Sequence, residues 1–281
     1  MFDLPCRSSR WIGAVVAGSL GALCISHSAS GGAIVSDAFS GIHGGSIDQR
    51  TPDTDNLPGS TWTMLPFGSF GGAYISTQYG GNPSPVAWLR NDGNSTGGIA
   101  ISIADAGNYL KPSKFTISAD IAFDGSAATN AGVGFYSALP TEATSGDTIL
   151  THFTGLQLQW WNTLGELQLV VNGATVGSPI AYTGTFAPTA YHTLSYTVDT
   201  TTGAISNVDL QGSTSSYNFD TSGFSNTATA YAAAATTYTW GRDHWMAFDN
   251  FSVSAVPEPT SIALLGLGGG FLMVRRREKH R

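Results

Sequence analysis

The chain has 281 residues, of which only 11% are charged, and its formal net charge is −7 at pH 7. The middle of the chain is more acidic. Subtracting Asp3, Glu258 and Glu278 from the 19 carboxylates leaves 16 in the segment 31–256, against five cations there, a net charge of −11. Such a surface repels a phosphate backbone, so the composition argues against nucleic-acid binding and favours calcium or neutral glycans as partners.

The first 30 residues have the pattern of a signal peptide. Arg7 and Arg10 supply a basic start, residues 11–25 form an apolar segment, and the small residues at 28–30 offer a cleavage site. We therefore predict that residues 1–30 direct export and are then removed.

Both cysteines of the chain, Cys6 and Cys24, lie in this leader. The mature chain would therefore contain neither a disulfide nor a free thiol. Lipidation of Cys24 is an alternative to cleavage by an ordinary signal peptidase. Leu23 argues against it, because a lipobox has Gly or Ala at that position.

Residues 31–255 are predicted to form one β-sandwich domain. Short alternating apolar runs are separated by Gly, Asn, Asp, Ser and Thr, and almost no segment has a helical period. Strands are expected over 114–123, 132–138, 156–161, 167–171, 192–198 and 246–253. Many strands without crossover helices predict an all-β fold, an antiparallel sandwich or jelly roll.

A calcium site is one candidate in this domain. Asp53 and Asp55 place carboxylates close together in a loop flanked by Pro and Gly, and calcium prefers such oxygen ligands. The alternative is that these residues simply make a turn. Asp249 and Asn250 are expected to fix the closing strand through backbone hydrogen bonds.

A hairpin near residue 163 supplies a candidate glycan site. A four-residue turn over 162–165 would pair Trp161 with Glu166 and Gln159 with Gln168. One face would then turn to the core, through Leu156, Leu158, Trp160, Leu167, Leu169 and Val171. The other would carry Gln157, Gln159, Trp161, Glu166 and Gln168. An indole among amides suits a pyranose ring, unless a loop covers Trp161.

Two patterns resemble parts of enzyme sites, and neither predicts a catalytic residue. Glycoside hydrolases need two carboxylates beside the scissile bond, but Glu142 and Glu166 have no acidic partner at strand spacing. The sequence Gly93-Asn94-Ser95-Thr96-Gly97 matches a nucleophile elbow. A helix must follow such an elbow, whereas the segment 98–104 alternates like a strand.

The last 26 residues, 256–281, combine three features in order. Val256-Pro257-Glu258-Pro259 precedes an apolar run over 261–274, and Arg275, Arg276 and Arg277 follow it. A helix over the run would span about 21 Å, short of the roughly 30 Å of a hydrocarbon core. The segment therefore suits transient membrane insertion, with the arginines on the cytoplasmic side.

This segment resembles the PEP-CTERM sorting signal of exported bacterial proteins, also called the ice-binding-protein C-terminal domain. The resemblance implies a partner, an exosortase-type membrane peptidase, which reads the motif and cuts near it. It also implies a protein anchored in the membrane by the C-terminal helix before processing, and located in the envelope or outside the cell afterwards. The alternative, an ordinary tail anchor, has no use for two prolines around a glutamate.

Three internal segments suggest a second resemblance. They are residues 132–136 (Gly-Val-Gly-Phe-Tyr), 191–199 with Gly203 beyond, and 248–253 (Phe-Asp-Asn-Phe-Ser-Val). Their order is similar to the concanavalin A-like lectin/glucanase jelly roll, which includes laminin-G-like modules, over about residues 37–254. The resemblance implies a structural role for His192, and sugar binding on the concave face or on rim loops.

Together these patterns predict an exported surface or extracellular-matrix protein whose sandwich is non-catalytic and binds an extracellular polysaccharide. The alternatives are a purely structural surface protein and a glycoside hydrolase. Exposed aromatic clusters would favour binding, two carboxylates about 5 to 9 Å apart in a groove would favour the enzyme, and neither would favour the structural role.

Overall fold

The structure is a computed structural model, and it describes one compact unit, Gly32–Val256. The described residues are 33–56, 60–65, 72–77, 85–91, 96–103, 114–123, 129–136, 138–139, 152–161, 164–182, 187, 189–199, 202, 204–210, 231–238 and 244–256. The predicted signal peptide and the apolar C-terminal segment lie outside them. Within these ranges the structure contains no helix with the length and apolarity to cross a membrane.

Two antiparallel sheets account for the strands of the described ranges. Sheet A contains β1 (Ala33–Asp37), β2 (Thr54–Asp55), β4 (Gly72–Ser76), β5 (Val86–Asn91), β7 (Lys114–Phe123), β12 (His192–Asp199), β13 (Ile205–Leu210) and β15 (His244–Ala255). Sheet B contains β3 (Trp62–Met64), β6 (Thr96–Ser102), β8 (Thr129–Tyr136), β9 (Phe153–Trp161), β10 (Leu164–Val171), β11 (Ala174–Ala181) and β14 (Tyr231–Tyr238). This arrangement confirms the predicted all-β sandwich.

The core lies between the two sheets. In β7, Phe115, Ile117 and Ile121 alternate with more exposed residues and contact the core, as predicted. Leu158 and Leu169 reach the same cluster from sheet B. Strand β6 begins at Thr96, inside the elbow-like motif, so a strand stands where a nucleophile elbow needs a helix.

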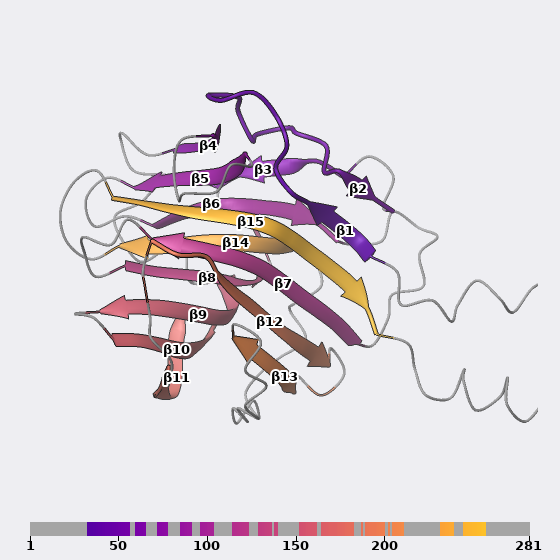
Figure 1. Cartoon of the computed structure of the whole chain (residues 1–281). Helices are drawn as coiled ribbons and strands as arrows, with labels where there is room; N and C mark the ends of the chain where they lie inside the picture. Colours follow the sequence, from indigo (N-terminus) through magenta and orange to yellow (C-terminus); the bar gives the residue numbers. More distant parts are fainter. Residues whose placement is uncertain are drawn as a thin grey trace, which may run out of the picture. The chain divides into compact units, whose positions relative to one another are not determined.

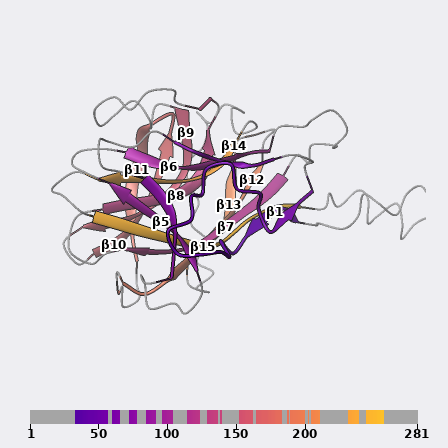
Figure 2. The same ribbon diagram turned by 90° about the horizontal axis from the view of Figure 1, so that it is seen from above.

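Strand β15 joins the parts of sheet A. It pairs with β7 along one edge, while its other edge pairs first with β5 and then with β1. Figures 1 and 2 both show β5 and β1 at opposite ends of β15. Between these partners, the register shifts by one residue from Asp249 to Ser252, and Asn250 has a left-handed φ of 48°. This bulge leaves Asn250 exposed and Phe251 in the core.

The β9–β10 hairpin corrects the predicted turn. Trp161 pairs with Leu164, and Gln159 pairs with Glu166, so two residues rather than four connect the strands. The pairing therefore differs from the prediction by two residues. Because side chains alternate with a period of two, the described residues keep their predicted faces, with Leu156, Leu158, Leu167 and Leu169 in the core.

A tyrosine links the two sheets across the core. Tyr196 of β12 is fully buried, and its hydroxyl donates to Val133 O of β8 and lies 3.4 Å from Leu156 N of β9. Burial raises the pKa of Tyr196 above its ordinary value. The strands are close here, because a Cβ on Gly155 would lie 2.5 Å from Val133 O and 2.8 Å from the Tyr196 hydroxyl.

Candidate functional site

Aromatic side chains gather at one end of the outer face of sheet A, the face that points away from the core. Tyr74 of β4 lies opposite Trp88 of β5, with ring centroids 6.1 Å apart. Trp88 lies opposite Ala247 of β15, and Ala247 lies opposite Ala122 of β7. The row of directly opposite residues that begins with Tyr74 and Trp88 therefore continues with two alanines.

Two more aromatic residues pack against these alanines. Tyr191 and Trp245 contact the buried group formed by Val86, Ala122 and Ala247. Tyr74 is 40% exposed and the other three are half-buried, while the Trp88 indole nitrogen and the Tyr191 hydroxyl oxygen are buried. We call this group the aromatic layer: Tyr74, Trp88, Tyr191 and Trp245.

Next to the aromatic layer, an acidic row crosses the same face. Asp249 of β15 lies opposite Asp120 of β7, which lies opposite Thr193 of β12. Thr193 Oγ1 donates to Asp120 Oδ1, and Asn250 Nδ2 donates to Asp120 Oδ2 at 2.8 Å. Burial raises the pKa of Tyr191 above its ordinary value, and the nearby Asp249 and Asp120 raise it further.

This carboxylate pair was not predicted from the sequence. Asp120 and Asp249 come from strands that are distant in the chain, so they are not two residues apart within one strand. The alternating pattern indicates that both side chains point away from the core. It does not indicate that β7 pairs with β15. The backbone role expected of Asp249 is present, since Asp249 Oδ1 accepts from Asn250 N at 2.7 Å.

Small hydroxyl side chains continue the face beyond the acidic row. Directly opposite residues on neighbouring strands form two rows, which we call the hydroxyl rows. The first is Thr54, Ser36, Ser252, Ser118 and Ser195, and the second is Ser254, Thr116, Thr197 and Ser206. Neighbouring strands lie about 4.8 Å apart, so hydroxyl groups repeat at this spacing across the sheet.

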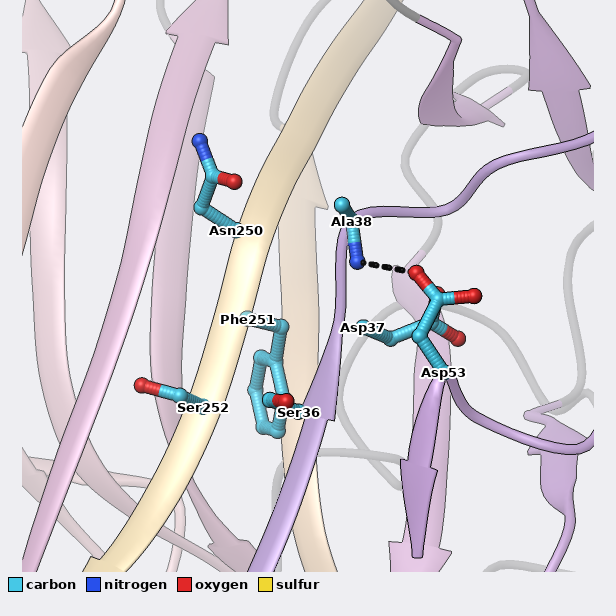
Figure 3. Close-up of a pocket in the computed structure, with 7 residues that line it drawn as sticks. All are labelled: Ser36, Asp37, Ala38, Asp53, Asn250, Phe251 and Ser252. Atoms are coloured by element: carbon cyan, nitrogen blue, oxygen red, sulfur yellow. Dashed lines mark hydrogen bonds between the residues drawn. The ribbon is translucent and has the colours of Figure 1, made fainter. Parts of the chain in front are cut away.

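A pocket of about 290 Å³ opens between β15 and the β1–β2 segment (Figure 3). It lies where the first hydroxyl row approaches Asn250. Its lining residues are Ser36, Asp37, Ala38, Asp53, Asn250, Phe251 and Ser252. The pocket is therefore bounded by hydroxyl, amide and carboxylate groups above an aromatic residue of the core.

Asp53 is held in place by three donors. Ala38 N lies 3.0 Å from its Oδ2, and Ser40 Oγ and Arg50 Nη2 each lie 3.0 Å from its Oδ1. Arg50 also forms a bidentate pair with the buried Asp37, with distances of 3.1 and 2.9 Å. The hydrogen bond with Asp37 is the main cause that raises the pKa of Arg50, against the effect of burial.

Asp37 is anchored from inside the protein. The indole of the fully buried Trp62 donates to its Oδ2 at 2.7 Å, and Phe39 N donates to its Oδ1 at 2.7 Å. A continuous chain of hydrogen bonds thus runs from the core through Arg50 to the pocket wall at Asp53.

The two predicted calcium ligands have different surroundings. Asp53 binds Arg50, which already supplies a positive charge at its carboxylate, and Asp55 lies in β2 opposite Val35. The described part of the chain contains no group of three or more His, Cys, Asp or Glu side chains arranged to hold a metal ion. Calcium binding by Asp53 and Asp55 stays a prediction.

The structure changes the predicted glycan site on the hairpin. Gln157 and Gln168 lie opposite each other but are 3% and 1% exposed, and Gln168 Nε2 donates to Val176 O at 2.9 Å and to Leu169 O at 3.0 Å. The prediction required both amides to be exposed to solvent, and it is wrong on this point. Gln159 and Glu166 are half-buried, and the side chain of Trp161 lies outside the described part.

His192 has the structural environment that the sequence analysis expected. It is buried, and its Nε2 lies 2.7 Å from Ala187 O. Of the sorting residues, only Val256 is described, and its N–H donates to Lys114 O at 3.0 Å. The Pro-Glu-Pro motif at 257–259 and Arg275, Arg276 and Arg277 lie outside the described residues.

Residues 255–277 match the PEP-CTERM protein-sorting motif. This match confirms the sorting signal predicted from the Pro-Glu-Pro sequence, the apolar run and the arginines. The motif indicates export and association with the cell envelope. A comparison with curated proteins found no match.

The chain is also similar to solved structures of proteins named for carbohydrates. One is a sialidase, with 8% identity, a TM-score of 0.42, and coverage of 69% of this chain but only 17% of the sialidase chain. Another is the carbohydrate esterase vb_24B_21 of the Shiga toxin-encoding bacteriophage phi24B, with 15% identity, coverage of 69% and 89%, and a TM-score of 0.44. The Emp47p carbohydrate recognition domain has 14% identity, coverage of 81% and 100%, and a TM-score of 0.45.

Proposed function

We propose that the exported sandwich binds a neutral glycan, without cleaving it, through the outer face of sheet A. The aromatic layer beside rows of polar groups on an accessible face is the observation that supports this proposal. Aromatic rings pack on the apolar faces of sugars, while hydroxyl, amide and carboxylate groups bond sugar hydroxyls. The acidic surface of the domain favours neutral over anionic glycans.

This face is a better candidate than the hairpin around Trp161. It presents four partly accessible aromatic residues, whereas two of the five residues predicted for the hairpin site are buried. The two locations can be separated by experiment, because each contains a tryptophan that can be replaced without touching the other.

The test is binding of the full-length chain, purified in mild detergent, to immobilised neutral and anionic polysaccharides. Trp88→Ala and Trp245→Ala are compared with Trp161→Ala, with and without calcium. We expect the first two variants to weaken binding to neutral polysaccharides about tenfold, and Trp161→Ala to have little effect. Calcium dependence would indicate a role for Asp53 and Asp55. A folded wild-type protein that binds none of the polysaccharides would refute the proposal and favour a purely structural surface protein.

The carboxylate pair supports a second candidate function, glycoside hydrolysis. Directly opposite residues on antiparallel strands have Cβ atoms about 5 Å apart, which suits the short carboxylate separation of retaining enzymes. However, Asp249 is only 3% exposed, and both oxygens of Asp120 accept hydrogen bonds from the protein. Release of reducing ends by the wild-type protein, abolished in Asp120→Asn, would establish the enzyme instead of the binding module.

The sorting motif supports a proposed partner, an exosortase-type membrane peptidase. If such an enzyme reads the motif, Glu258→Ala should leave the tail attached in cells, and the surface protein should be larger by the mass of the tail. Mass spectrometry of the surface fraction measures this difference. Masses that differ by no more than the Glu-to-Ala substitution would exclude processing that depends on this motif.

A further inference from the structure

The pocket beside the bulge of β15 is separate from the aromatic layer, and its largely apolar lining carries a few polar groups. Ser36 and Ser252 lie directly opposite each other across β1 and β15, and Asn250 and Asp53 complete the wall. Figure 3 shows Asn250 and Ser252 on β15, with Ala38 and Asp53 on the side of β1 and β2. A volume of about 290 Å³ lies at the lower end of the range for small-molecule sites and suits a single sugar ring.

The polar groups of this wall are positioned before any ligand binds. Asp53 is fixed by Ala38 N, Ser40 and Arg50, and Arg50 is fixed in turn by Asp37. Asn250 is fixed by its left-handed backbone and by its bond to Asp120. Groups that are already oriented lose little entropy on binding, so a small polar ligand can be held by few contacts.

A largely apolar lining with a few polar groups suits a neutral ring that packs its C–H face on the lining and bonds the polar groups through its hydroxyls. A carboxylate accepts hydrogen bonds, a serine hydroxyl can donate or accept, and an amide can do both. Two carboxylates, Asp37 and Asp53, line the pocket, and the single cation Arg50 binds both of them. The net charge of this group is −1, which disfavours a uronate or a phosphate.

We propose that this pocket binds one neutral pyranose ring, as a subsite of the glycan-binding face. The inference rests on the proposed function, because the face supplies the rest of the glycan contacts. The first hydroxyl row starts at the pocket with Ser252 and continues to Ser118 and Ser195, so further rings of the same glycan would extend across β7 and β12.

The test uses single-ring probes on the full-length chain: methyl mannoside, methyl glucoside and methyl galactoside, with glucuronic acid as the charged control. Ser252→Ala removes one hydroxyl. Asn250→Gly removes the amide and keeps the left-handed backbone, because glycine tolerates positive φ. We expect each variant to weaken binding of at least one methyl glycoside about 3- to 10-fold, as measured by calorimetric titration. Thermal unfolding shows whether the variants remain folded.

Thr175→Ala serves as the matched control, because it removes an exposed hydroxyl on β11, outside the pocket and the aromatic layer, and it should leave methyl glycoside binding unchanged. If Ser252→Ala or Asn250→Gly weakens methyl glycoside binding more than Trp88→Ala does, the pocket is a separate subsite and the inference stands. If the wild type binds polysaccharides and neither Ser252→Ala nor Asn250→Gly changes binding of any probe, the inference is wrong and the proposed function survives. If the wild type binds neither the polysaccharides nor the methyl glycosides, both are wrong. Tighter binding of glucuronic acid than of the neutral probes would also overturn the inference.

Discussion

The two sheets have outer faces of opposite character. On sheet A the outer face carries half-buried serines and threonines and the partly exposed aromatic layer. On sheet B, Ala100, Tyr136, Phe153 and Val170 belong to a separate buried cluster, and Gln168 is 1% exposed. Both sheets alternate between core-facing and outward residues, but in sheet B the accessible outward positions of the described part lie at its β10–β11 end, whereas Gln157, Gln168 and the separate cluster are covered. Pointing away from the core and being exposed to solvent are therefore different properties.

The largest expected effect comes from close packing on sheet B. Gly155→Ala would place a Cβ 2.5 Å from Val133 O and 2.6 Å from Gly134 Cα, and both are backbone atoms. We expect the free energy of unfolding to fall by about 3 kcal/mol, measured by urea titration. Ser118→Ala, on the outer face of sheet A, should change it by less than about 0.5 kcal/mol. Equal losses would contradict the contrast between the faces.

A buried amide should matter more than an exposed hydroxyl. Gln168→Ala removes two hydrogen bonds, to Leu169 O and Val176 O, in a buried environment. We expect a loss of about 1 to 2 kcal/mol in thermal unfolding. Thr193→Ala, at an exposed position of the acidic row, should cost about 0.5 kcal/mol. A larger loss in the free energy of unfolding for Thr193→Ala than for Gln168→Ala would contradict this expectation.

Two fully buried tyrosines allow a finer comparison. Tyr196→Phe removes the bond that links the sheets, and we expect a loss of about 1 kcal/mol. No described residue hydrogen-bonds the hydroxyl of Tyr136, so Tyr136→Phe should leave the free energy of unfolding unchanged or raise it slightly. Denaturant titration at pH 7 measures both. A larger loss for Tyr136→Phe would show that its hydroxyl has a partner.

The same tyrosines predict a loss of stability in alkali. Burial raises the pKa of Tyr136 and of Tyr196 above the ordinary value near 10, so the unfolded state loses its protons first. Their contribution is complete below pH 10 and is lost as pH rises from there toward the folded-state pKa, with a slope of up to about 1.4 kcal/mol per pH unit for each tyrosine. Unfolding at pH 8 to 11 should show a smaller slope in Tyr136→Phe. An unchanged slope would mean that Tyr136 reaches solvent.

The smallest effect involves no change in stability. Hydroxyl-radical footprinting of the native protein should modify Tyr74, which is 40% exposed, and spare Tyr136, which is fully buried. Mass spectrometry of the peptides gives both rates in one sample. Similar rates for the two tyrosines would show that the outer face of sheet B is open as well.

The sequence predicted the sandwich and its strands because alternation reports directly which side chains reach the core, as in 114–123. It also kept the hairpin faces correct despite the wrong turn length, since an error of two residues preserves the side-chain direction. It could not show that Gln157 and Gln168 are buried, because their cover comes from tertiary packing. It also could not bring Asp120 next to Asp249, or Asn250 next to the pocket, because both depend on the order of strands in sheet A.

The position of β15 also bears on mechanical strength. The sorting motif begins at Ala255, the last residue of this strand, so a force applied to the tail is transmitted first to β15. Because β15 is bonded to β7 on one edge and to β5 and β1 on the other, pulling along its axis loads many perpendicular hydrogen bonds in shear at once. A tethered domain would therefore resist extraction by tension far better than one attached through an edge strand that can be peeled away bond by bond.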